Sequence, residues 1–561
     1  MNQTPHVATT KTMWAALLLL CLAIFIPGQT ALPVMDRDEA RFAQASKQML
    51  ESGDFVHIYF QETPRAKKPV GIYWLQSASA HLFGGANAPI GAYRLPSILG
   101  AIAAVLATFY FGSFMFGARI AFLAAGFLAS SLIVANEAHL AKTDAVLLAT
   151  TVMVQGTLAR YYLFSKNQTS APGIGTFGIL WLAMGAGILI KGPVTPLVAL
   201  LSISVISIWD KNWNWFSKTR PLFGIVIAAL VAMPWAIAVS FDGNGAGGGG
   251  NFIVRAISED LLPKLLGAQE SHGAPPGYYS LLSLVGLWPA SLFLLPAVWA
   301  AIKMREQPAV RFALAWAIPL WLVFELIPTK LPHYVLPAFP ALTLLIAHSL
   351  ANATNIFNAL PARIWAVIWV VPGLALGVAA IVLPFIAGDG FNPWSLMAAI
   401  GAAVATFWGV LLFFKQRLWQ AATAIIVGGA ITYGSIFQGV LPALNDAWIS
   451  ERMATNLETY FAENKITNNR PVILSGYNEP SAIFLLGTKT RNAGPEGAAG
   501  LLASGEYSAA FISENGNQAF LSVINSQNTA IKQISTINGF NYSKGKKLTL
   551  HIYVPADRII Q

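Results

Sequence analysis

The sequence predicts a polytopic α-helical membrane protein of about thirteen transmembrane helices, with a small C-terminal extracytoplasmic α/β domain. Hydrophobic residues make up 55% of the 561-residue chain and charged residues only 11%, whereas a soluble domain carries about 25% charged residues. Apolar runs long enough to cross a bilayer, which takes roughly 20 helical residues, also follow one another along most of the chain.

Net charge and cysteine content limit which kinds of binding site this membrane protein can contain. The chain carries a net charge of +10, but its basic residues lie in short loops between apolar runs, as membrane topology requires. Nucleic-acid binding is therefore not expected. The single cysteine, Cys21, lies inside the first apolar run, so neither an intramolecular disulfide nor a cysteine metal cluster can form.

The first apolar run follows Lys11 and is expected to be a retained membrane anchor. A cleaved signal peptide is the alternative, but the run approaches the length of a span and no small-x-small cleavage site ends it. Twelve further candidate spans lie near residues 92–113, 118–136, 143–162, 174–190, 193–208, 221–240, 279–301, 309–328, 331–349, 362–386, 393–414 and 418–439. An odd number of spans places the two termini on opposite sides of the membrane.

Basic residues decide which side each loop faces. With a cytoplasmic N-terminus, the cytoplasmic connections carry Arg119, Arg160, Lys166, Lys211, Lys218, Arg220, Lys303, Arg305, Arg311, Arg363, Lys415 and Arg417. This is the positive-inside pattern. The first loop at 34–91, a flexible Gly-rich loop at 241–278 and the C-terminal region are then expected on the periplasmic side of a bacterial inner membrane.

Composition divides the chain into a transmembrane domain at 1–440 and a second domain at 445–561. In the second part, PVILSGY, YSAAFIS and KKLTLHIYVP are predicted strands, and ERMATNLETYFAEN is a predicted helix. These elements predict a small periplasmic α/β domain. Because it has no P-loop, no GxGxxG and no nucleophile elbow, it is interpreted as accessory.

The first loop carries a marked pattern of charged residues. The acidic pair Asp38 and Glu39 opens an expected helix, and Arg41 follows one turn later on the face of Asp38. Further on, two lysines directly precede a proline at 67–69, and proline favours the first turn of a helix. Cations there oppose the helix dipole unless an anion joins them, so the loop is a candidate phosphate site.

Polar residues at the ends of several spans gather on the same predicted periplasmic side. Besides the first loop, the contributors are Glu137, His139, Lys142, Asp144, Lys191, Glu270, His272, Tyr278, Lys330, His333 and Tyr334. Each has a structural alternative: lysines snorkel, carboxylates neutralise nearby lysines, and lone histidines away from metal-ligand spacing are more often hydrogen-bonded structural residues. Ionisable groups at this depth tend to be paired or functional, so we expect them to converge on one site.

Six motifs occur in order along the chain: DEARFA, KKPVGIYWLQ, TDA, LIKGP, HGAPPGYY and KLPHYVLPAFP. Together they resemble the polyprenyl-phosphate-dependent membrane glycosyltransferases. That superfamily has the GT-C fold and includes the aminoarabinose transferases of lipid A and the protein O-mannosyltransferases. The resemblance covers almost the whole chain. Any one motif is weak, but six in order are specific.

The resemblance implies roles for individual residues. Asp38 corresponds to the catalytic aspartate at the start of the first loop, and Arg41 and Lys68 correspond to donor-phosphate positions. Asp144 matches a second acidic position of the family. Asp36 competes with Asp38, but the DEARFA register and the spacing to Lys68 favour Asp38.

Two positions depart from the pattern of the aminoarabinose enzymes. Lys67 stands where they usually have Glu, and Phe42 stands where they have Tyr. Lys67 removes a potential metal ligand and puts the aminoarabinose donor in doubt.

The same residues suit this reaction on chemical grounds. The outer compartment contains no ATP or nucleotide sugars, so a glycosyl donor there must arrive as a lipid-linked phosphate sugar. Arg41 and Lys68, with Lys191 or Lys330 behind them, would stabilise the charge that grows on the leaving phosphate. Asp38 would orient and deprotonate the acceptor hydroxyl in one inverting displacement.

Further residues are candidates for binding substrate. They are Glu39, Tyr73, Asp144, His272, His333 and Tyr334. Aromatic residues at a membrane interface are more often belt residues, which is the alternative for the two tyrosines. The visible residues require no cofactor, while Asp and His at the site leave a divalent metal open.

The sequence therefore predicts an integral inner-membrane glycosyltransferase that moves a sugar from undecaprenyl phosphate or a similar polyprenyl phosphate to lipid A or another envelope acceptor. A protein O-glycosyltransferase is the alternative within the class. A lipid or sugar transporter is the alternative from another class, but the charged residues collect at one membrane face rather than lining a path across it.

Overall fold

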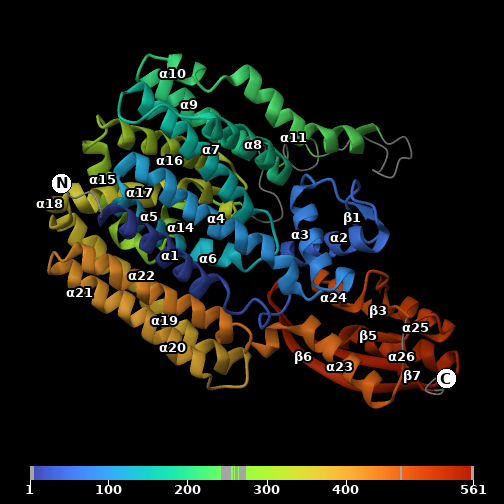
Figure 1. Ribbon diagram of the computed structural model, residues 1–561. Coiled ribbons are helices and arrows are strands. Elements are labelled where there is room, and N and C mark those ends of the chain that lie inside the picture. Colours follow the sequence, from blue (N-terminus) through green and yellow to red (C-terminus); the bar gives the residue numbers. More distant parts are fainter. Residues whose placement is uncertain are drawn as a thin grey trace.

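The computed structural model describes residues 5–241, 273–467 and 470–556, together with positions 254, 256, 258 and 263. A bundle of long helices makes up most of the molecule (Figure 1). Two helices of the first loop and the C-terminal sheet lie together at one end of this bundle, opposite the end where the chain starts (Figure 1). This shared end is where the predicted site residues come from.

The helical bundle follows the apolar runs of the sequence. Its longer helices are α1 (Pro5–Phe25), α4 (Ile90–Phe116), α5 (Ala118–Ala129), α6 (Leu132–Ala138), α7 (Asp144–Ser165), α8 (Ile174–Lys191), α9 (Val194–Trp209), α11 (Pro221–Phe241), α14 (Tyr278–Gly286), α15 (Leu294–Lys303), α16 (Pro308–Leu326), α17 (Phe339–Asn352), α19 (Leu360–Ala387), α20 (Pro393–Ala403), α21 (Gly409–Phe414) and α22 (Leu418–Ser435). Short helices join or extend them: α10 (Asn214–Ser217), η3 (Ala290–Phe293), η4 (Pro332–Ala338), α18 (Thr354–Phe357), η5 (Val404–Trp408), η6 (Ile436–Val440) and η7 (Asn445–Ala447).

Every run predicted as a span lies on a helix or on a series of short helices. Within the described ranges, eight helices are long and apolar enough to cross a membrane, or nine if α5 and α6 form one bent span. The polytopic helical fold class is thus confirmed. The number of thirteen spans stays a prediction, because several runs are divided into shorter helices.

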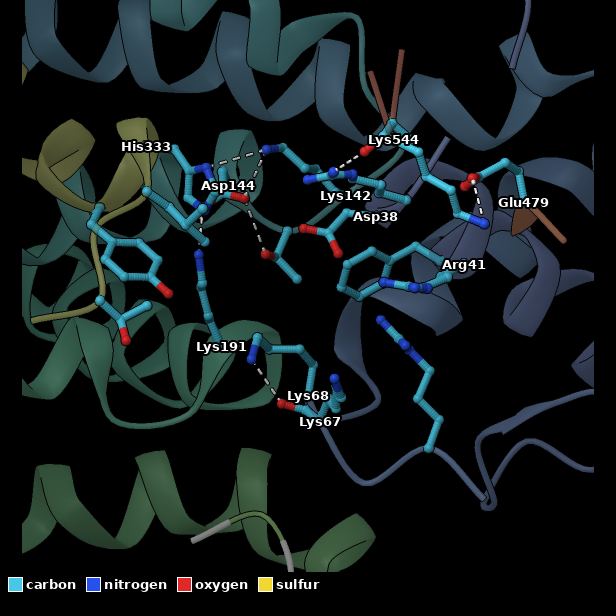
Figure 2. Close-up of a pocket in the computed structure, with 18 residues that line it drawn as sticks. Asp38, Arg41, Lys67, Lys68, Lys142, Asp144, Lys191, His333, Glu479 and Lys544 are labelled. Carbon is cyan, nitrogen blue, oxygen red and sulfur yellow. Dashed lines mark hydrogen bonds and ion pairs between the residues drawn. The ribbon is translucent and has the colours of Figure 1, made fainter. Parts of the chain in front are cut away.

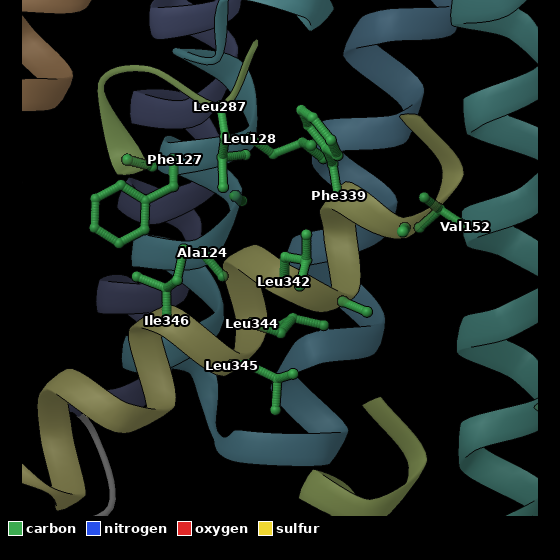
Figure 3. Close-up of a cluster of buried hydrophobic side chains, with 14 of the residues drawn as sticks. Ala124, Phe127, Leu128, Val152, Leu287, Phe339, Leu342, Leu344, Leu345 and Ile346 are labelled. Atoms are coloured by element: carbon green, nitrogen blue, oxygen red, sulfur yellow. The ribbon is translucent and has the colours of Figure 1, made fainter. Parts of the chain in front are cut away.

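Helix α17 forms the centre of the bundle. The apolar stretch Pro332–Asn352 that contains it is 89% buried inside the protein, whereas the spans of α11 and α19 are only 22% buried. Phe339, Leu342 and Ile346 of α17 lie in one cluster of buried side chains with residues of α5 (Figure 3). A helix that is apolar all round must be buried in protein or in lipid, so α11 and α19 face the membrane.

The first loop folds into its own small layer on the bundle. Its elements are α2 (Asp38–Ser52), β1 (Tyr59–Phe60), β2 (Thr63–Pro64), α3 (Gly71–Leu82) and η1 (Gly85–Asn87). Helix α2 ends at Gly53, whose positive φ of 71° lets its N–H bond back to the carbonyl of Met49. A Cβ atom on Gly71 would lie 2.7 Å from the carbonyl oxygen of Leu189, so glycine there lets α3 start directly against the end of α8.

The C-terminal region is a sheet covered by helices on both faces. Its elements are α23 (Ile449–Glu463), β3 (Val472–Ser475), α24 (Pro480–Leu486), β4 (Arg491–Asn492), α25 (Pro495–Ser504), β5 (Ala509–Ser513), α26 (Glu514–Ser526), β6 (Ile531–Asn541) and β7 (Lys546–Pro555). The strand order is β4-β3-β5-β7-β6, with β3 parallel to β4 and β5, and β7 antiparallel to β5 and β6. Alternate strand residues point to α23 and α24 on one face and to α25 and α26 on the other.

The C-terminal region is docked on the first loop by polar contacts. Lys47 Nζ donates to the carbonyl of Phe484 at 3.0 Å, and Gln44 Nε2 donates to Thr488 Oγ1 at 2.7 Å. Gln61 Nε2 donates to the carbonyls of Thr488 and Thr490 at 3.0 and 2.6 Å. These contacts hold α24 and the segment that follows it against α2 and the β1–β2 turn.

Candidate active site

A cavity of about 430 Å³ lies where the first loop, the ends of the bundle helices and the C-terminal region meet (Figure 2). Its lining consists of Arg37, Asp38, Arg41, Phe42, Arg65, Lys67, Lys68, Lys142, Thr143, Asp144, Lys191, Thr329, Leu331, His333, Tyr334, Glu479, Ser543 and Lys544. Among the residues that the structure describes, eight lining side chains are cationic and three are carboxylates. This balance suits an anionic ligand such as a phosphate.

Asp38 is the first residue of α2, and it is exposed to the cavity. A carboxylate at this position is favoured by the positive end of the helix dipole. In Figure 2, Asp38 lies between Lys142 on one side and Arg41 on the other. The preceding residue, Arg37, has φ 67° and ψ −111°, which are unusual for a residue other than glycine. Such backbone strain persists where the surroundings hold it in place.

Asp36, the competing candidate, is turned away from the cavity. It does not line the cavity, and its carboxylate accepts hydrogen bonds from the Ser481 hydroxyl and backbone N–H. Its own N–H donates to the Tyr542 hydroxyl at 2.7 Å. Asp36 therefore joins the first loop to the C-terminal region, and Asp38 is the carboxylate that a substrate in the cavity would meet.

The Asp36 contact predicts a pH-dependent stability. Burial raises the pKa of this carboxyl from 3.8 to about 6, in spite of the Ser481 hydrogen bonds. Because the folded state binds the proton more tightly than the unfolded state, the contribution of Asp36 to stability is greatest below pH ~4 and is lost as the pH rises through 6. We therefore expect the melting temperature of the wild type minus that of Asp36→Asn to decrease as the pH is raised from 4 to 7. A constant difference would contradict this expectation.

A network of ion pairs forms the wall opposite α2. Asp144, the first residue of α7, accepts from Lys191 Nζ at 2.5 Å and lies 3.7 Å from Lys142 Nζ. Lys142 also pairs with Glu137 at 2.9 Å and donates toward His333 Nδ1 at 3.4 Å. Burial alone would lower the pKa of Lys142, but Glu137 and Asp144 outweigh this effect and raise the pKa above its ordinary value. Lys142 therefore stays cationic.

Asp144 lines the cavity and lies at the centre of this network. Its Oδ1 accepts from Lys191 and lies 3.8 Å from His333 Nε2, while its Oδ2 accepts from the Thr143 hydroxyl at 3.4 Å. Lys191 also lies over the ring of Tyr334, 5.7 Å from its centre. Asp144 thus holds Lys191 at the cavity edge, and all five residues line the cavity as a set.

The first-loop cations form the remaining wall. Lys67 and Lys68 lie near Lys191 in Figure 2, and Lys68 Nζ donates to the carbonyl of Lys67 at 2.8 Å. The Arg65 guanidinium stacks over Phe42, 5.2 Å from the ring centre. Arg41 comes from the second turn of α2. The cations come from separate elements, which the contact of Gly71 with α8 holds close together.

Three predicted site residues lie outside the cavity, and their contacts explain why. Lys330 donates to the carbonyls of Phe324, Glu325 and Ile327 at 3.2, 2.8 and 2.7 Å, so its ammonium caps the end of α16. Tyr73 is fully buried, packs on Phe42 and bonds Arg65 Nε through its hydroxyl at 3.2 Å.

Glu39 is the third correction. Its carboxylate is 2% exposed and accepts from Arg94 Nε and Nη2, each at 2.8 Å. The backbone N–H groups of Met35 and Ala141 also donate to it at 2.8 Å. Glu39 is therefore buried in an ion pair with Arg94 and does not line the cavity. His272, predicted to bind substrate, and most of the predicted flexible loop at 241–278 lie outside the described residues.

Two features of the site are not among those predicted from the sequence. Arg94 lies in an apolar helix, where an arginine signals a buried partner, and that partner is Glu39. Glu479, Ser543 and Lys544 come from the C-terminal region that was interpreted as accessory. The available signal was the basic turn SKGKK between two strands. No group of three or more His, Cys, Asp or Glu side chains is placed to hold a metal within the described part of the chain.

Comparison with known proteins agrees with this fold. Residues 12–243 match the family model described as dolichyl-phosphate-mannose-protein mannosyltransferase. The undecaprenyl phosphate-alpha-4-amino-4-deoxy-L-arabinose arabinosyl transferase of Edwardsiella ictaluri is 26% identical over 434 residues, 75% of each chain. The protein of that description from Yersinia pestis strain Pestoides F is 27% identical over 72% of this chain and 73% of its own.

Solved structures show the same fold over nearly the full length. The crystal structure of ArnT from Cupriavidus metallidurans bound to undecaprenyl phosphate matches with a TM-score of 0.74 and 18% identity, covering 99% of both chains. The apo oligosaccharyltransferase of Archaeoglobus fulgidus matches with a TM-score of 0.51 and 12% identity, over 93% of this chain and 72% of its own.

The fold, the relatives and the cationic cavity agree on a membrane glycosyltransferase, the class of enzyme that the sequence motifs predict. Within that class, the chain is similar to the aminoarabinose and mannose transferases whose names include a lipid phosphate donor. The fold class and the enzyme class expected from the sequence motifs are both confirmed.

Proposed function

We propose that this protein transfers a sugar from undecaprenyl phosphate to lipid A or another envelope lipid at the periplasmic face of the bacterial inner membrane. The observation that carries the proposal is the cavity itself, in which an exposed Asp38 is surrounded by cations at one end of the helical bundle. The curated relatives, named for an undecaprenyl-phosphate-linked aminoarabinose, favour a pentose as the sugar. Lys67 and Phe42 are the two positions at which the motif pattern departs from that of the aminoarabinose enzymes.

The proposed chemistry is one displacement at the anomeric carbon. The bond from this carbon to the phosphate oxygen breaks, and its electron pair leaves with the polyprenyl phosphate. Arg41, Lys68 and Lys191 stabilise the charge that appears there. The acceptor oxygen forms the new bond on the opposite face, and Asp38 takes its proton, which inverts the configuration. An acceptor phosphate is already anionic, and Asp38 would then position it. The proposal assigns charge neutralisation to these side chains and requires no cofactor.

The orientation in the membrane is part of the proposal. The N-terminus is cytoplasmic and the C-terminal region periplasmic, because the basic loops follow the positive-inside rule. The site end of the bundle, which lies opposite the start of the chain in Figure 1, then faces the periplasm. A lipid-linked donor that has crossed the membrane presents its phosphate at this level.

Mass spectrometry of envelope lipids from cells with and without the protein tests the function. We expect loss of the protein to remove a sugar from lipid A and to cause polyprenyl-phosphate sugar to accumulate. Donor accumulation with unchanged lipid A would favour a protein acceptor, the alternative that the mannosyltransferase family match supports. If neither pool changed, the transferase assignment would be wrong.

Lys68→Ala is expected to impair use of the donor. Removing one preorganised cation from the leaving phosphate typically lowers the rate by roughly 10²-fold. Steady-state kinetics with a purified lipid-linked donor should show this loss in kcat/KM for the donor, with partial recovery in Lys68→Arg. An unchanged donor kcat/KM, or a change confined to the acceptor KM, would contradict the assignment of Lys68 to the donor phosphate.

A further inference from the structure

The cavity carries more positive charge than its proposed donor needs. A sugar linked to a polyprenyl phosphate is a phosphodiester with a single negative charge. Against this, eight cationic side chains and three carboxylates line the cavity among the described residues. The surplus is large enough for a second anionic group next to the donor phosphate.

Four of these cations lie in two places around Asp38. Lys67, Lys68 and Lys191 are close together on one side of Asp38 in Figure 2, and Lys544 lies on the other side of it. The first group comes from the first loop and α8, and Lys544 comes from the β6–β7 turn of the C-terminal region. A phosphate bound by Lys68 and Lys191 would leave Lys544 to meet a different group.

Lys544 is held in place by its own neighbours. Its Nζ donates to Asn478 Oδ1 at 2.6 Å and lies 3.7 Å from Glu479 Oε1. Asn541 donates to the same Glu479 oxygen at 2.9 Å and accepts from the backbone N–H of Lys544 at 3.1 Å. The Lys544 side chain is nevertheless 50% exposed, so its ammonium is oriented by the turn and still accessible to a ligand.

The β6–β7 turn is also fixed relative to Asp38. The Ser543 carbonyl accepts a hydrogen bond from the Arg37 guanidinium, and the Tyr542 hydroxyl accepts one from the Asp36 N–H. Arg37 has the unusual positive φ and directly precedes Asp38. The position of Lys544 relative to the candidate catalytic carboxylate is therefore set by the two turn residues that precede it, Tyr542 and Ser543, and by two residues of the first loop, Asp36 and Arg37.

We propose that Lys544, together with Arg37, binds an anionic group of the acceptor, a phosphate in the case of lipid A, and that the C-terminal region thereby selects the acceptor. This inference rests on the proposed transfer to an envelope lipid. It gives the C-terminal region a direct role in substrate binding. The acceptor oxygen then reaches Asp38 from the side opposite Lys68 and Lys191.

Kinetics of Lys544→Ala in the full-length protein test this subsite. Lys546→Ala is the matched control, because Lys546 is an exposed lysine two residues further along the chain that does not line the cavity. The donor is undecaprenyl-phosphate aminoarabinose, and the acceptors are lipid A and dephosphorylated lipid A. Losing one charge-assisted hydrogen bond should raise the KM of Lys544→Ala for lipid A by about tenfold. The donor KM and the KM for dephosphorylated lipid A should change by less than about twofold.

The outcomes separate this inference from the proposed function. If the wild-type protein transfers the sugar but Lys544→Ala and Lys546→Ala have the same KM for lipid A, the subsite is overturned and the proposed function stands. A raised donor KM in Lys544→Ala would assign the lysine to the donor, and equal losses with both acceptors would make its role structural; either result also overturns the subsite. Absence of wild-type transfer to both acceptors would overturn the proposed lipid A acceptor, and the subsite with it.

Discussion

Asp38→Asn is expected to slow sugar transfer by about 10²–10⁴-fold while leaving the protein folded. The Asp38 carboxylate is exposed to the cavity. Among the described residues, none donates a hydrogen bond to it, whereas the carboxylates of Glu39 and Asp36 accept hydrogen bonds from Arg94 and Ser481 that hold the first loop in place. The asparagine side chain has nearly the same shape as that of aspartate, but it cannot accept a proton from the acceptor. General-base catalysis is typically worth 10²–10⁴-fold, so kcat should fall by about that factor.

Asp36→Asn is the matched control for Asp38→Asn. Asp36 lies two residues earlier on the same segment, but its carboxylate bonds Ser481 and does not line the cavity. Turnover of Asp36→Asn should stay close to wild type at neutral pH, with elution and melting profiles checking that both variants fold. An Asp38→Asn enzyme with normal turnover would remove Asp38 from the mechanism. Equal losses in both variants would indicate a general effect on the loop.

The sequence predicted the fold and the location of the site because both depend on local patterns. Apolar runs mark helices whatever their neighbours are, and every predicted span lies on helical segments. Positions such as Lys68, Lys191 and His333 are near span ends on one predicted side, and the structure brings them to one cavity. The order of the motifs was sufficient to indicate the class of enzyme.

What sequence could not resolve is the direction in which neighbouring side chains point. Asp38 and Glu39 are adjacent, but successive residues of a helix point about 100° apart, so one faces the cavity and the other Arg94. Lys191 and Lys330 both follow apolar helices, yet Lys191 pairs with Asp144 while Lys330 caps α16. The Arg37–Ser543 contact joins residues 506 positions apart, and no local pattern indicates such a contact.

Glu39→Ala is expected to destabilise the protein strongly, and activity should be lost only as the fold is lost. Arg94 is fully buried, and its remaining donors go to the carbonyls of Gln29, Leu32 and Pro33. Removing the carboxylate leaves the guanidinium without its counter-charge and two backbone N–H groups without their acceptor. Breaking a buried ion pair in this way typically costs about 3–5 kcal/mol.

Glu306→Ala provides the comparison for this prediction, because the Glu306 side chain is 75% exposed although it pairs with Arg311. Exposed pairs contribute about 0–1 kcal/mol, so Glu306→Ala should melt close to wild type. Thermal unfolding of purified protein, with kcat measured per folded molecule, separates the two possible roles of Glu39. A stable Glu39→Ala variant with a low kcat would support the role in substrate binding that the sequence predicts for Glu39. An unstable variant with normal kcat per folded molecule would show that Glu39 holds α2 in place, so that Asp38 can face the cavity.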